Sequence, residues 1–293
     1  MNTILAPSVV ENSSLGSSRG NEALISEEGQ GRSGDQSLLT SAATILGVPS
    51  ETTSTVVSRA ELTGRQTDEM FALLAEHFEG VTDAQFERDL SEKSHVVLIT
   101  RDGCLAGFST LLAYETGFEQ APVSVVYSGD TIVAPEAWGT TALPRAWIAA
   151  VNQLRATVPR GRYYWLLLTS GFRTYRFLPV FWREFFPCFE RATPPESQQL
   201  LHHLARERFG AQYDPGSGVV RFAQPQRLRP ELNQIPEGRE AADPHVDFFA
   251  RRNPGCAQGD ELVCLTELTP DNLTAAGRRM VRPRRDELLC RDC

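Results

Sequence analysis

The stretch SGDTIVAPEAWGTTALPRAW, residues 128–147, holds the residues best suited to chemistry. A β-type run gives way there to a helical one through a turn that contains Gly139, Thr140 and Thr141. The N-terminus of a helix offers unpaired N–H groups and about half a positive charge, so anions bind there. Two interpretations are open: the turn binds a phosphate group, or it is an ordinary connection from a strand to a helix.

The predicted strand before this turn, residues 123–133, has Gly129 in its middle. A glycine inside a strand costs stability unless a bulge or a closely approaching backbone requires it. The helix after the turn, residues 143–158, carries apolar side chains along one stripe, as a helix packed on a sheet does. A nearly continuous apolar run at 163–170 then predicts a buried central strand.

Other elements must hold this central part in place. Residues 94–100 and 104–114 alternate like strands and flank an Asp-Gly pair, which is a strong hairpin signal. Two helices are expected before the hairpin, capped by Thr67 and Thr82. The remaining predicted elements are a strand at 54–62, a helix with Pro179 in its first turn, a helix within 194–210, and strands at 218–223 and 260–268.

Composition limits the class of protein. The chain has 293 residues, of which 41% are hydrophobic, so it can bury a sizeable core. A net charge of -8 without a dense Lys/Arg block argues against nucleic acid as a partner. No apolar run is long enough to span a bilayer, and the first residues lack the features of a signal peptide. We therefore expect a folded cytoplasmic protein without a membrane span.

Metal chemistry is not expected. Cys290 and Cys293 form a lone CxxC near the C-terminus, and a single such pair supplies too few ligands for a zinc site. His202 and His203 are adjacent on a predicted helix and point about 100° apart, which makes them a poor metal site. Hydrolase, nucleotide-triphosphatase and metalloprotease motifs (GxSxG, the Walker loop, HExxH) are missing from the sequence.

The chain divides into three parts by composition. Residues 1–52 are rich in Ser, Gly, Asn and Glu, which predicts a disordered leader. Residues 53–270 carry the predicted strands and helices and form a single domain. Residues 271–293 form a charged C-terminal tail.

The order of these elements resembles that of the GNAT superfamily, the acyl-CoA-dependent N-acyltransferases. The order is a strand, two helices, a tight hairpin, a long bulged strand, a helix, a buried strand and a further helix. The resemblance covers residues 54–270 and rests on that order more than on a motif. It implies an α/β fold, with a mixed, largely antiparallel central sheet flanked by helices and a C-terminal extension.

In that family, the turn after the bulged strand carries an (Arg/Gln)-x-x-Gly-x-(Gly/Ala) pattern whose amides hold the pyrophosphate of CoA. This chain keeps Gly139 but has Trp138 where Arg or Gln is expected. Thr140 and Thr141 stand in place of further glycines, and either one can cap the helix. With Thr141 as the cap, Pro144 takes the third helical position and removes one phosphate donor. The resemblance thus implies a weakened CoA site at residues 138–141.

The resemblance also implies a catalytic arrangement. The bulged strand separates from its parallel neighbour, and a backbone N–H, that of Ile132 or Val133, polarises the thioester carbonyl placed in the notch. A general base stands near the bulge, where Asp130 and Tyr127 are candidates, and Glu136 is a weaker one. A partly buried carboxylate can have its pKa raised toward neutrality, which suits proton removal from an ammonium.

The helix after the buried strand often supplies a tyrosine that protonates the departing thiolate, and Tyr175 is the nearest candidate here. Taken together, the resemblance implies acyl transfer from acyl-CoA, or from an acyl carrier, to a small amine in a direct ternary complex, without a metal. The departures in the turn leave an alternative open. In that alternative the domain has lost catalysis and binds an acyl group or a partner protein.

Overall fold

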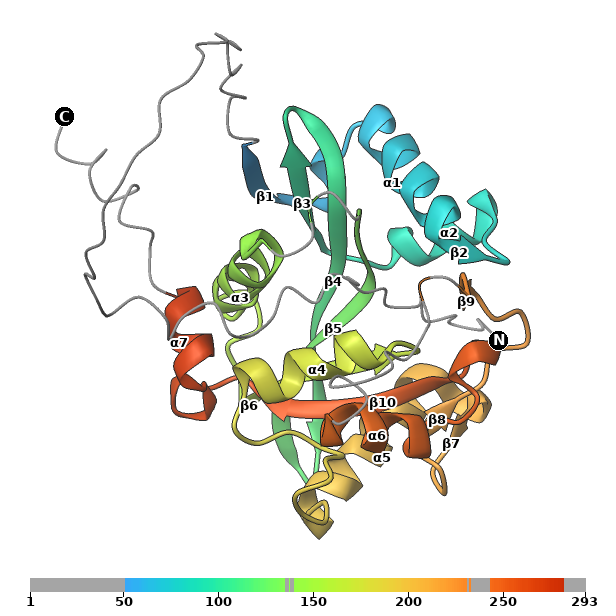
Figure 1. Ribbon diagram of the computed structural model, residues 1–293. Coiled ribbons are helices and arrows are strands. Elements are labelled where there is room, and N and C mark those ends of the chain that lie inside the picture. The colour runs from blue at the N-terminus through green and yellow to red at the C-terminus, as the bar shows by residue number, and fades with distance from the viewer. Residues whose placement is uncertain (1–50, 135–136, 138–139, 231, 233–242, 282–293) are drawn as a thin grey trace, which may run out of the picture.

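A computed structural model describes residues 51–134, 137, 140–230, 232 and 243–281 (Figure 1). Within these residues, eight strands form one sheet in the order β1-β3-β4-β5-β6-β10-β8-β7. The strands are β1 Thr52–Ser58, β3 His95–Arg101, β4 Cys104–Phe118, β5 Ala121–Val133, β6 Arg162–Thr169, β7 Tyr213–Asp214, β8 Val219–Val220 and β10 Glu261–Glu267. A separate short pair joins β2 Phe78–Glu79 to β9 Arg227–Leu228.

The sheet is mixed and largely antiparallel, as the order of elements predicted. Among the described ladders, the pairing of β5 with β6 is parallel and the others are antiparallel. The hairpin between β3 and β4 turns at Asp102 and Gly103, with φ of 51° and 82°. Positive φ at both central residues is what a two-residue hairpin of this kind requires, so the hairpin prediction is confirmed.

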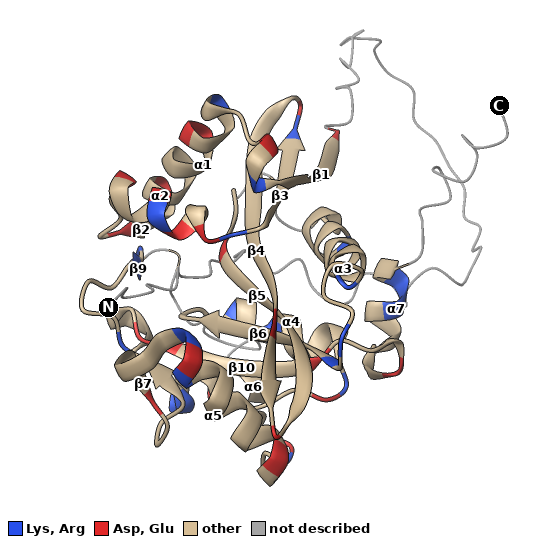
Figure 2. Cartoon of the chain, turned by 180° about the vertical axis from the view of Figure 1, so that it is seen from behind, with Lys and Arg blue, Asp and Glu red and all other residues tan. Residues whose placement is uncertain are grey.

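Helices cover both faces of the sheet. The helices are α1 Gly64–His77, α2 Asp83–Ser91, α3 Ala142–Leu154, α4 Phe172–Phe181, α5 Pro195–Phe209, α6 Pro244–Arg252 and α7 Ala275–Val281. Apolar side chains of α3, α4 and α6 form one core with one face of the sheet. The other face packs against α1 and α2 at one end and against α5 at the other. Figure 2, from behind, shows this second face, with acidic and basic residues interspersed on its helices.

Three helix predictions differ from the structure. Helix α1 begins after Thr63, whose hydroxyl accepts from the Gln66 amide at 3.2 Å, and not at the predicted cap Thr67. Helix α4 begins at Phe172, and Pro179 lies near its end. A proline there removes one helical hydrogen bond, and the helix ends two residues later. Helix α6 lies in a segment that we expected to be a loop.

Part of the segment assigned to the tail is packed on the domain. Helix α7 contacts α3 and α4, and the buried Gly277 lies against the backbone carbonyl of Phe181. The predicted leader lies outside the described residues up to residue 50, and so do residues 282–293 with Cys290 and Cys293.

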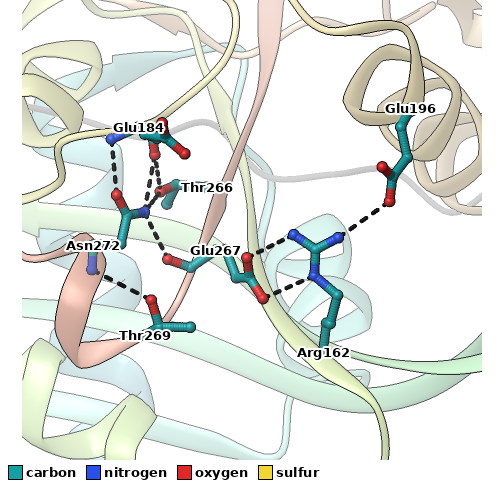
Figure 3. Close-up of polar contacts among 7 residues, drawn as sticks. All are labelled: Arg162, Glu184, Glu196, Thr266, Glu267, Thr269 and Asn272. Carbon is teal, nitrogen blue, oxygen red and sulfur yellow. Dashed lines mark hydrogen bonds and ion pairs between the residues drawn. The ribbon is translucent and has the colours of Figure 1, made fainter.

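A polar network fastens this C-terminal segment to the sheet (Figure 3). The two N–H groups of the Asn272 amide Nδ2 are shared among three acceptors, the carbonyls of Glu184 at 3.0 Å and Glu267 at 2.8 Å and Thr266 Oγ1 at 3.1 Å. Its Oδ1 accepts from the Glu184 amide at 2.8 Å. Beside it, Arg162 binds both carboxylate oxygens of Glu267, at 2.9 and 2.7 Å. One side chain thus joins β10 to the segment that follows α4.

We expect Asn272→Ala to lower the free energy of unfolding by about 2–3 kcal/mol, since two donated bonds and one accepted bond are lost at about 1 kcal/mol each. Denaturant unfolding of the full chain measures this change. Asp271→Ala, at the exposed neighbouring position, is the matched control and is expected to change stability by less than about 0.5 kcal/mol. Equal midpoints for Asn272→Ala and the control would show that the network does not stabilise the fold.

Candidate active site

Strand β5 carries a bulge at its predicted position. Ser109 of β4 faces Thr131, whereas Leu111 faces Ser128, so Gly129 and Asp130 together lie opposite a single residue of β4. An extra residue of this kind bends the strand and increases its twist. The mid-strand glycine therefore marks a bulge, as the sequence predicted.

Strands β5 and β6 part at this bulge. Their parallel ladder runs from Val123 opposite Arg162 to Ser128 opposite Leu167, and it ends there. Beyond this point β6 still pairs with β10, as far as Thr169. The end of β5, from Gly129 to Val133, is thus paired with β4 and has left β6. The two strands therefore part at the bulge, where the resemblance implied a notch.

The hydrogen bonding of β5 distinguishes the two candidate backbone donors. The Ala134 amide donates to the Ala106 carbonyl of β4 at 2.8 Å. Because amides alternate between the two edges of a strand, Ile132 also faces β4 and Val133 faces the side from which β6 has departed. The Ile132 side chain is fully buried under α1 and α2. Val133 therefore presents its backbone on the notch side of β5.

Asp130 lies in a buried, charged cluster beside the bulge. Its side chain is 2% exposed, and no group in the described part of the chain bonds its Oδ1. Burial raises the pKa of Asp130 well above its ordinary value; the negative charge of Asp89 adds to this rise and Lys93 opposes it. The carboxyl therefore holds its proton to a higher pH than an exposed aspartate does.

Asp89 lies in the last turn of α2, Lys93 lies two residues beyond the end of that helix at Ser91, and each is 3% exposed. The Lys93 ammonium donates to the Asp89 backbone carbonyl at 2.8 Å and lies 5.5 Å from the centre of the Tyr127 ring. Burial raises the pKa of Asp89 to about 7 and lowers the pKa of Lys93 to about 8. Each shift follows from the cost of charging a group out of water.

Tyr127 is fully buried on the same face, with its ring packed edge-on against Phe209 and 4.4 Å from the guanidinium carbon of Arg208. Its hydroxyl lacks a hydrogen-bond partner among the described residues. Burial raises the pKa of Tyr127 well above its ordinary value. Both groups have a raised pKa, but the ordinary pKa of a phenol is 10.0 and that of an aspartate is 3.8, so Asp130 ionises more readily and is the better candidate for the base.

The turn before α3 is described only in part, since Glu136, Trp138 and Gly139 lie outside the described residues. Thr141 is the N-cap of α3, but its hydroxyl accepts from Arg145 Nε at 3.3 Å and caps no first-turn amide. The Thr140 hydroxyl donates to the Ala137 carbonyl at 3.0 Å. Pro144 occupies the third helical position, as predicted with Thr141 as the cap.

No protein-family model matches the chain, and no curated protein matches it. Among solved structures it is similar to a probable N-acyltransferase from Enterococcus faecalis, with 18% identity, a TM-score of 0.35 and 45% of this chain covered. That match spans a third, 33%, of the other protein's length. An acyl-CoA N-acyltransferase from Pseudomonas aeruginosa has 17% identity, coverage of 40% and 79% of the two chains, and a TM-score of 0.29.

A third similar structure is an aminoglycoside N-acetyltransferase in complex with CoA, with 13% identity, coverage of 56% of this chain and 90% of that one, and a TM-score of 0.31. At these scores the similarity is partial and carries no conclusion on reaction or substrate. The strand order, the bulge and the parting of β5 from β6 are the features on which the family resemblance rests. The fold is GNAT-like.

In this GNAT-like chain Tyr175 is a core residue. It is fully buried in α4, with the rings of Phe185, Phe248 and Phe249 at 6.0, 6.0 and 5.7 Å between centroids. Its hydroxyl donates to the Pro187 carbonyl at 2.8 Å. Burial raises the pKa of Tyr175 far above its ordinary value. These contacts support a packing role and give no support to its predicted part as an acid for the thiolate.

We expect Tyr175→Phe to lower the free energy of unfolding by about 1–2 kcal/mol, because the Pro187 carbonyl loses its donor. Acyl transfer at saturating donor should stay within about twofold of the wild-type rate. Chemical unfolding and thiol release, measured on the same preparation, test both statements. A fall in turnover of tenfold or more with unchanged stability would restore Tyr175 as the acid.

Sequence reasoning missed Asp89, Lys93 and Arg208. Lys93 is the single lysine of the chain. Asp89 lies on the inner side of α2, where Phe86 and Leu90 are buried. An acidic residue on the apolar face of a helix is the one signal that the sequence offered. The cluster itself could not be predicted, because α2, β5 and α5 are far apart along the chain.

Neither a metal-ligating cluster nor a helix that could span a membrane is found among the described residues. In the described part of the chain, no group of three or more His, Cys, Asp or Glu side chains could hold a metal ion. The His202 ring nitrogens lie 2.7 Å from the Tyr213 hydroxyl and 3.0 Å from Gln198 Nε2. None of the described helices is long and apolar enough to cross a bilayer.

Proposed function

We propose that the chain transfers an acyl group from acyl-CoA, or from an acyl carrier, to a small amine in a ternary complex. The observation that supports this most is the loss of β5–β6 pairing at the bulge, with Asp130 in the bulge itself. A notch between two strands, lined by backbone groups and next to a titratable carboxyl, suits a thioester that an amine attacks.

In the proposed reaction, the amine nitrogen attacks the thioester carbonyl carbon, the C–N bond forms and the C–S bond breaks. Asp130, in its carboxylate form, accepts the proton that the amine loses. Burial raises the pKa of Asp130 above that of an exposed aspartate, and a general base is most effective when its pKa is raised toward the working pH. The thiolate leaves as CoA thiol after taking a proton from water.

In this proposal the backbone amide of Val133, on the edge of β5 that faces away from β4, stabilises the oxyanion of the tetrahedral intermediate. A donor held in advance in a water-poor site contributes a few kcal/mol, about 3, to such a step. Ile132 is the less suitable of the two predicted donors, because its amide faces β4. Val133 is therefore the electrophile-stabilising residue in this proposal.

The turn before α3 is the proposed cradle for the CoA phosphates, formed by residues 138–141. Thr140 and Thr141 bring hydroxyls to the start of a 13-residue helix, and Arg145 in its first turn adds positive charge. The helix N-terminus favours an anion on its own. Pro144 removes one amide, so we expect weaker CoA binding than a turn with all its donors gives.

Two measurements on the full chain test this proposal. Thermal unfolding with CoA, acetyl-CoA and a long-chain acyl-CoA reports binding as a concentration-dependent rise in Tm. Thiol release with a panel of amines then reports turnover. Binding with amine-dependent release supports the transferase, and absence of both contradicts it.

A second candidate is a GNAT-like module that binds an acyl group or a partner without catalysis. The observation in its favour is the bonding of the Tyr175 hydroxyl to Pro187, which leaves the expected acid engaged in the core. In the same two measurements, a rise in Tm with acyl-CoA but no thiol release with any amine supports the module.

A further inference from the structure

The buried cluster on the α2 and α5 side of β5 has oxygen atoms that no described group satisfies. They are Asp89 Oδ2, Tyr127 Oη and Asp130 Oδ1, and their side chains are between 0% and 3% exposed. An unsatisfied polar atom in the interior costs on the order of 1–3 kcal/mol. The three side chains interact electrostatically with one another, so they belong to one cluster. Three unsatisfied oxygen atoms in one cluster suit a group that donates hydrogen bonds.

The charges of the cluster do not balance. Asp89 and Asp130 bring two negative charges when ionised, and Lys93 brings one positive charge. Arg208 faces the same region from α5, but its Nη2 is paired with Glu92 Oε2 at 2.9 Å. With both carboxyls ionised, the three central groups carry one uncompensated negative charge, and a bound cation would favour that ionised state over the protonated one.

Other charged groups face the cluster from the elements packed around it. Arg88 on α2 is exposed, and its positive charge lowers the pKa of Asp89. Glu261 of β10 is buried, and its negative charge raises the pKa of Tyr127. Arg208 also has an Nε without a partner, which is a donor and not an acceptor. Arg88, Glu261 and Arg208 therefore do not neutralise the extra negative charge that the cluster carries when both of its carboxyls are ionised.

Few cations suit this cluster. Among the described residues no group of three or more His, Cys, Asp or Glu side chains could hold a metal ion. A quaternary ammonium has the charge but no N–H group to satisfy the three oxygens. A primary ammonium has one positive charge and three N–H donors, one for each unsatisfied oxygen.

We propose that Asp89, Tyr127 and Asp130 form a buried receptor for a primary ammonium, and that this ammonium is the nitrogen to be acylated. Lys93 fixes the charge of the site, so that one ammonium fills it. Asp130 then binds the acceptor first and takes its proton afterwards. This inference rests on the proposed function for the fate of the nitrogen, but the binding site itself is independent of acyl transfer.

Binding of two probe ions to the full chain tests the proposal without any acyl donor. Methylammonium chloride is expected to raise Tm in a concentration-dependent way, whereas tetramethylammonium chloride, which has equal charge but no N–H, is expected to have only the effect of the salt. Isothermal titration gives the affinities. Equal responses to the two ions would overturn the proposal.

Substitutions in the cluster are expected to change the affinity for methylammonium in opposite directions. Asp89→Asn and Asp130→Asn are each expected to weaken methylammonium binding about tenfold or more, because a charged acceptor is lost. Lys93→Met removes the competing cation and is expected to strengthen binding severalfold. Asp68→Asn, at an exposed position of α1, is the matched control and should bind as the wild type does. Circular dichroism checks that each variant is folded, and Lys93→Gln replaces Lys93→Met if the latter does not fold.

Different experimental outcomes would contradict the acyl-transfer proposal and the ammonium-receptor proposal. Discrimination between the ions together with no response to acetyl-CoA would support the ammonium receptor and contradict acyl transfer. A response to acetyl-CoA with amine-dependent thiol release, but with unchanged methylammonium affinity in Asp89→Asn, would contradict the receptor and leave the transferase in place.

Discussion

Asp130→Asn is expected to lower the kcat of acyl transfer by about 100-fold or more at neutral pH. Asparagine keeps the size of the side chain but cannot accept a proton, and general base catalysis contributes about 10²–10⁴ to a rate. Because the pKa of Asp130 is raised by burial, the wild-type rate should rise with pH through that pKa. The variant should lack this rise. Thiol release at saturating acetyl-CoA, measured from pH 5 to pH 9, gives both results.

The donor site provides the internal control for this prediction. Asp130 has no part in the proposed phosphate cradle, so the acetyl-CoA concentration that raises Tm should be the same in Asp130→Asn and in the wild type. Asp68→Asn is expected to keep the wild-type rate and its pH profile. If Asp130→Asn turns over at the wild-type rate, Asp130 is not the base, whereas the fold and the notch are unaffected by that result.

Much of the fold follows from local patterns in the sequence. The Asp-Gly pair at 102–103 determines the hairpin, and Thr82 caps α2 as predicted, with its hydroxyl accepting from the Gln85 amide at 3.3 Å. The alternating strands and the continuous apolar run of β6 were also predicted. Each of these signals lies within a few residues, so neighbours along the chain are sufficient to interpret it.

Helix α4, for which the sequence put Pro179 in the first turn, shows where local patterns give a wrong prediction. A proline is favoured in the first turn of a helix, so Pro179 suggested a start. In the structure the side of α4 that carries Tyr175 and Leu178 is buried in the main core, and this packing stabilises a helix that begins at Phe172. Tertiary burial therefore outweighed the lost hydrogen bond at Pro179. Contacts between distant segments decide such cases, and a single sequence does not show them.

The short helix α6 was missed for a different reason. Asp243 caps it, accepting from the His245 amide at 2.9 Å, and Pro244 occupies its first turn. Both are recognised start signals. The helix has only nine residues and follows a stretch rich in Pro, Gln and Glu, so its periodic pattern is brief. Val246 and Phe249, three residues apart and buried, are the remaining signal.

The candidate site was predictable along β5 but not across the sheet. Gly129 and Asp130 were identified from the bulge, because one mid-strand glycine is enough to indicate it. The bulge also changes which side chains share a face, so that Tyr127 and Ile132 both lie on the side of α1, α2 and α5. Strict alternation places these two residues on opposite faces. Hence the meeting of Asp130 with Asp89 and Lys93 could not be derived from the strand pattern.

Asp89→Asn is expected to make the chain more stable than the wild type above pH 7, with a difference that disappears toward pH 4. In the folded chain burial raises the pKa of Asp89 to about 7 from 3.8. Such a group stabilises the fold fully below the unfolded pKa, and this contribution is lost as pH rises to the folded value. Asparagine has no proton to lose. The wild type should therefore lose up to about 4 kcal/mol relative to the variant across this window.

Thermal unfolding at pH 4.0, 5.5 and 7.5 measures this difference, with an expected relative change in Tm on the order of 10 °C. The series stops at pH 7.5 because the pKa of Lys93, lowered to about 8 by burial, gives the opposite slope at higher pH. Asp68→Asn should follow the wild type throughout. Parallel curves for Asp89→Asn and the wild type would mean that the pKa of Asp89 is the same in the folded and unfolded chains, as it would be if water reached the cluster freely. The excess negative charge would then be solvated, and a buried ammonium receptor would have no physical basis.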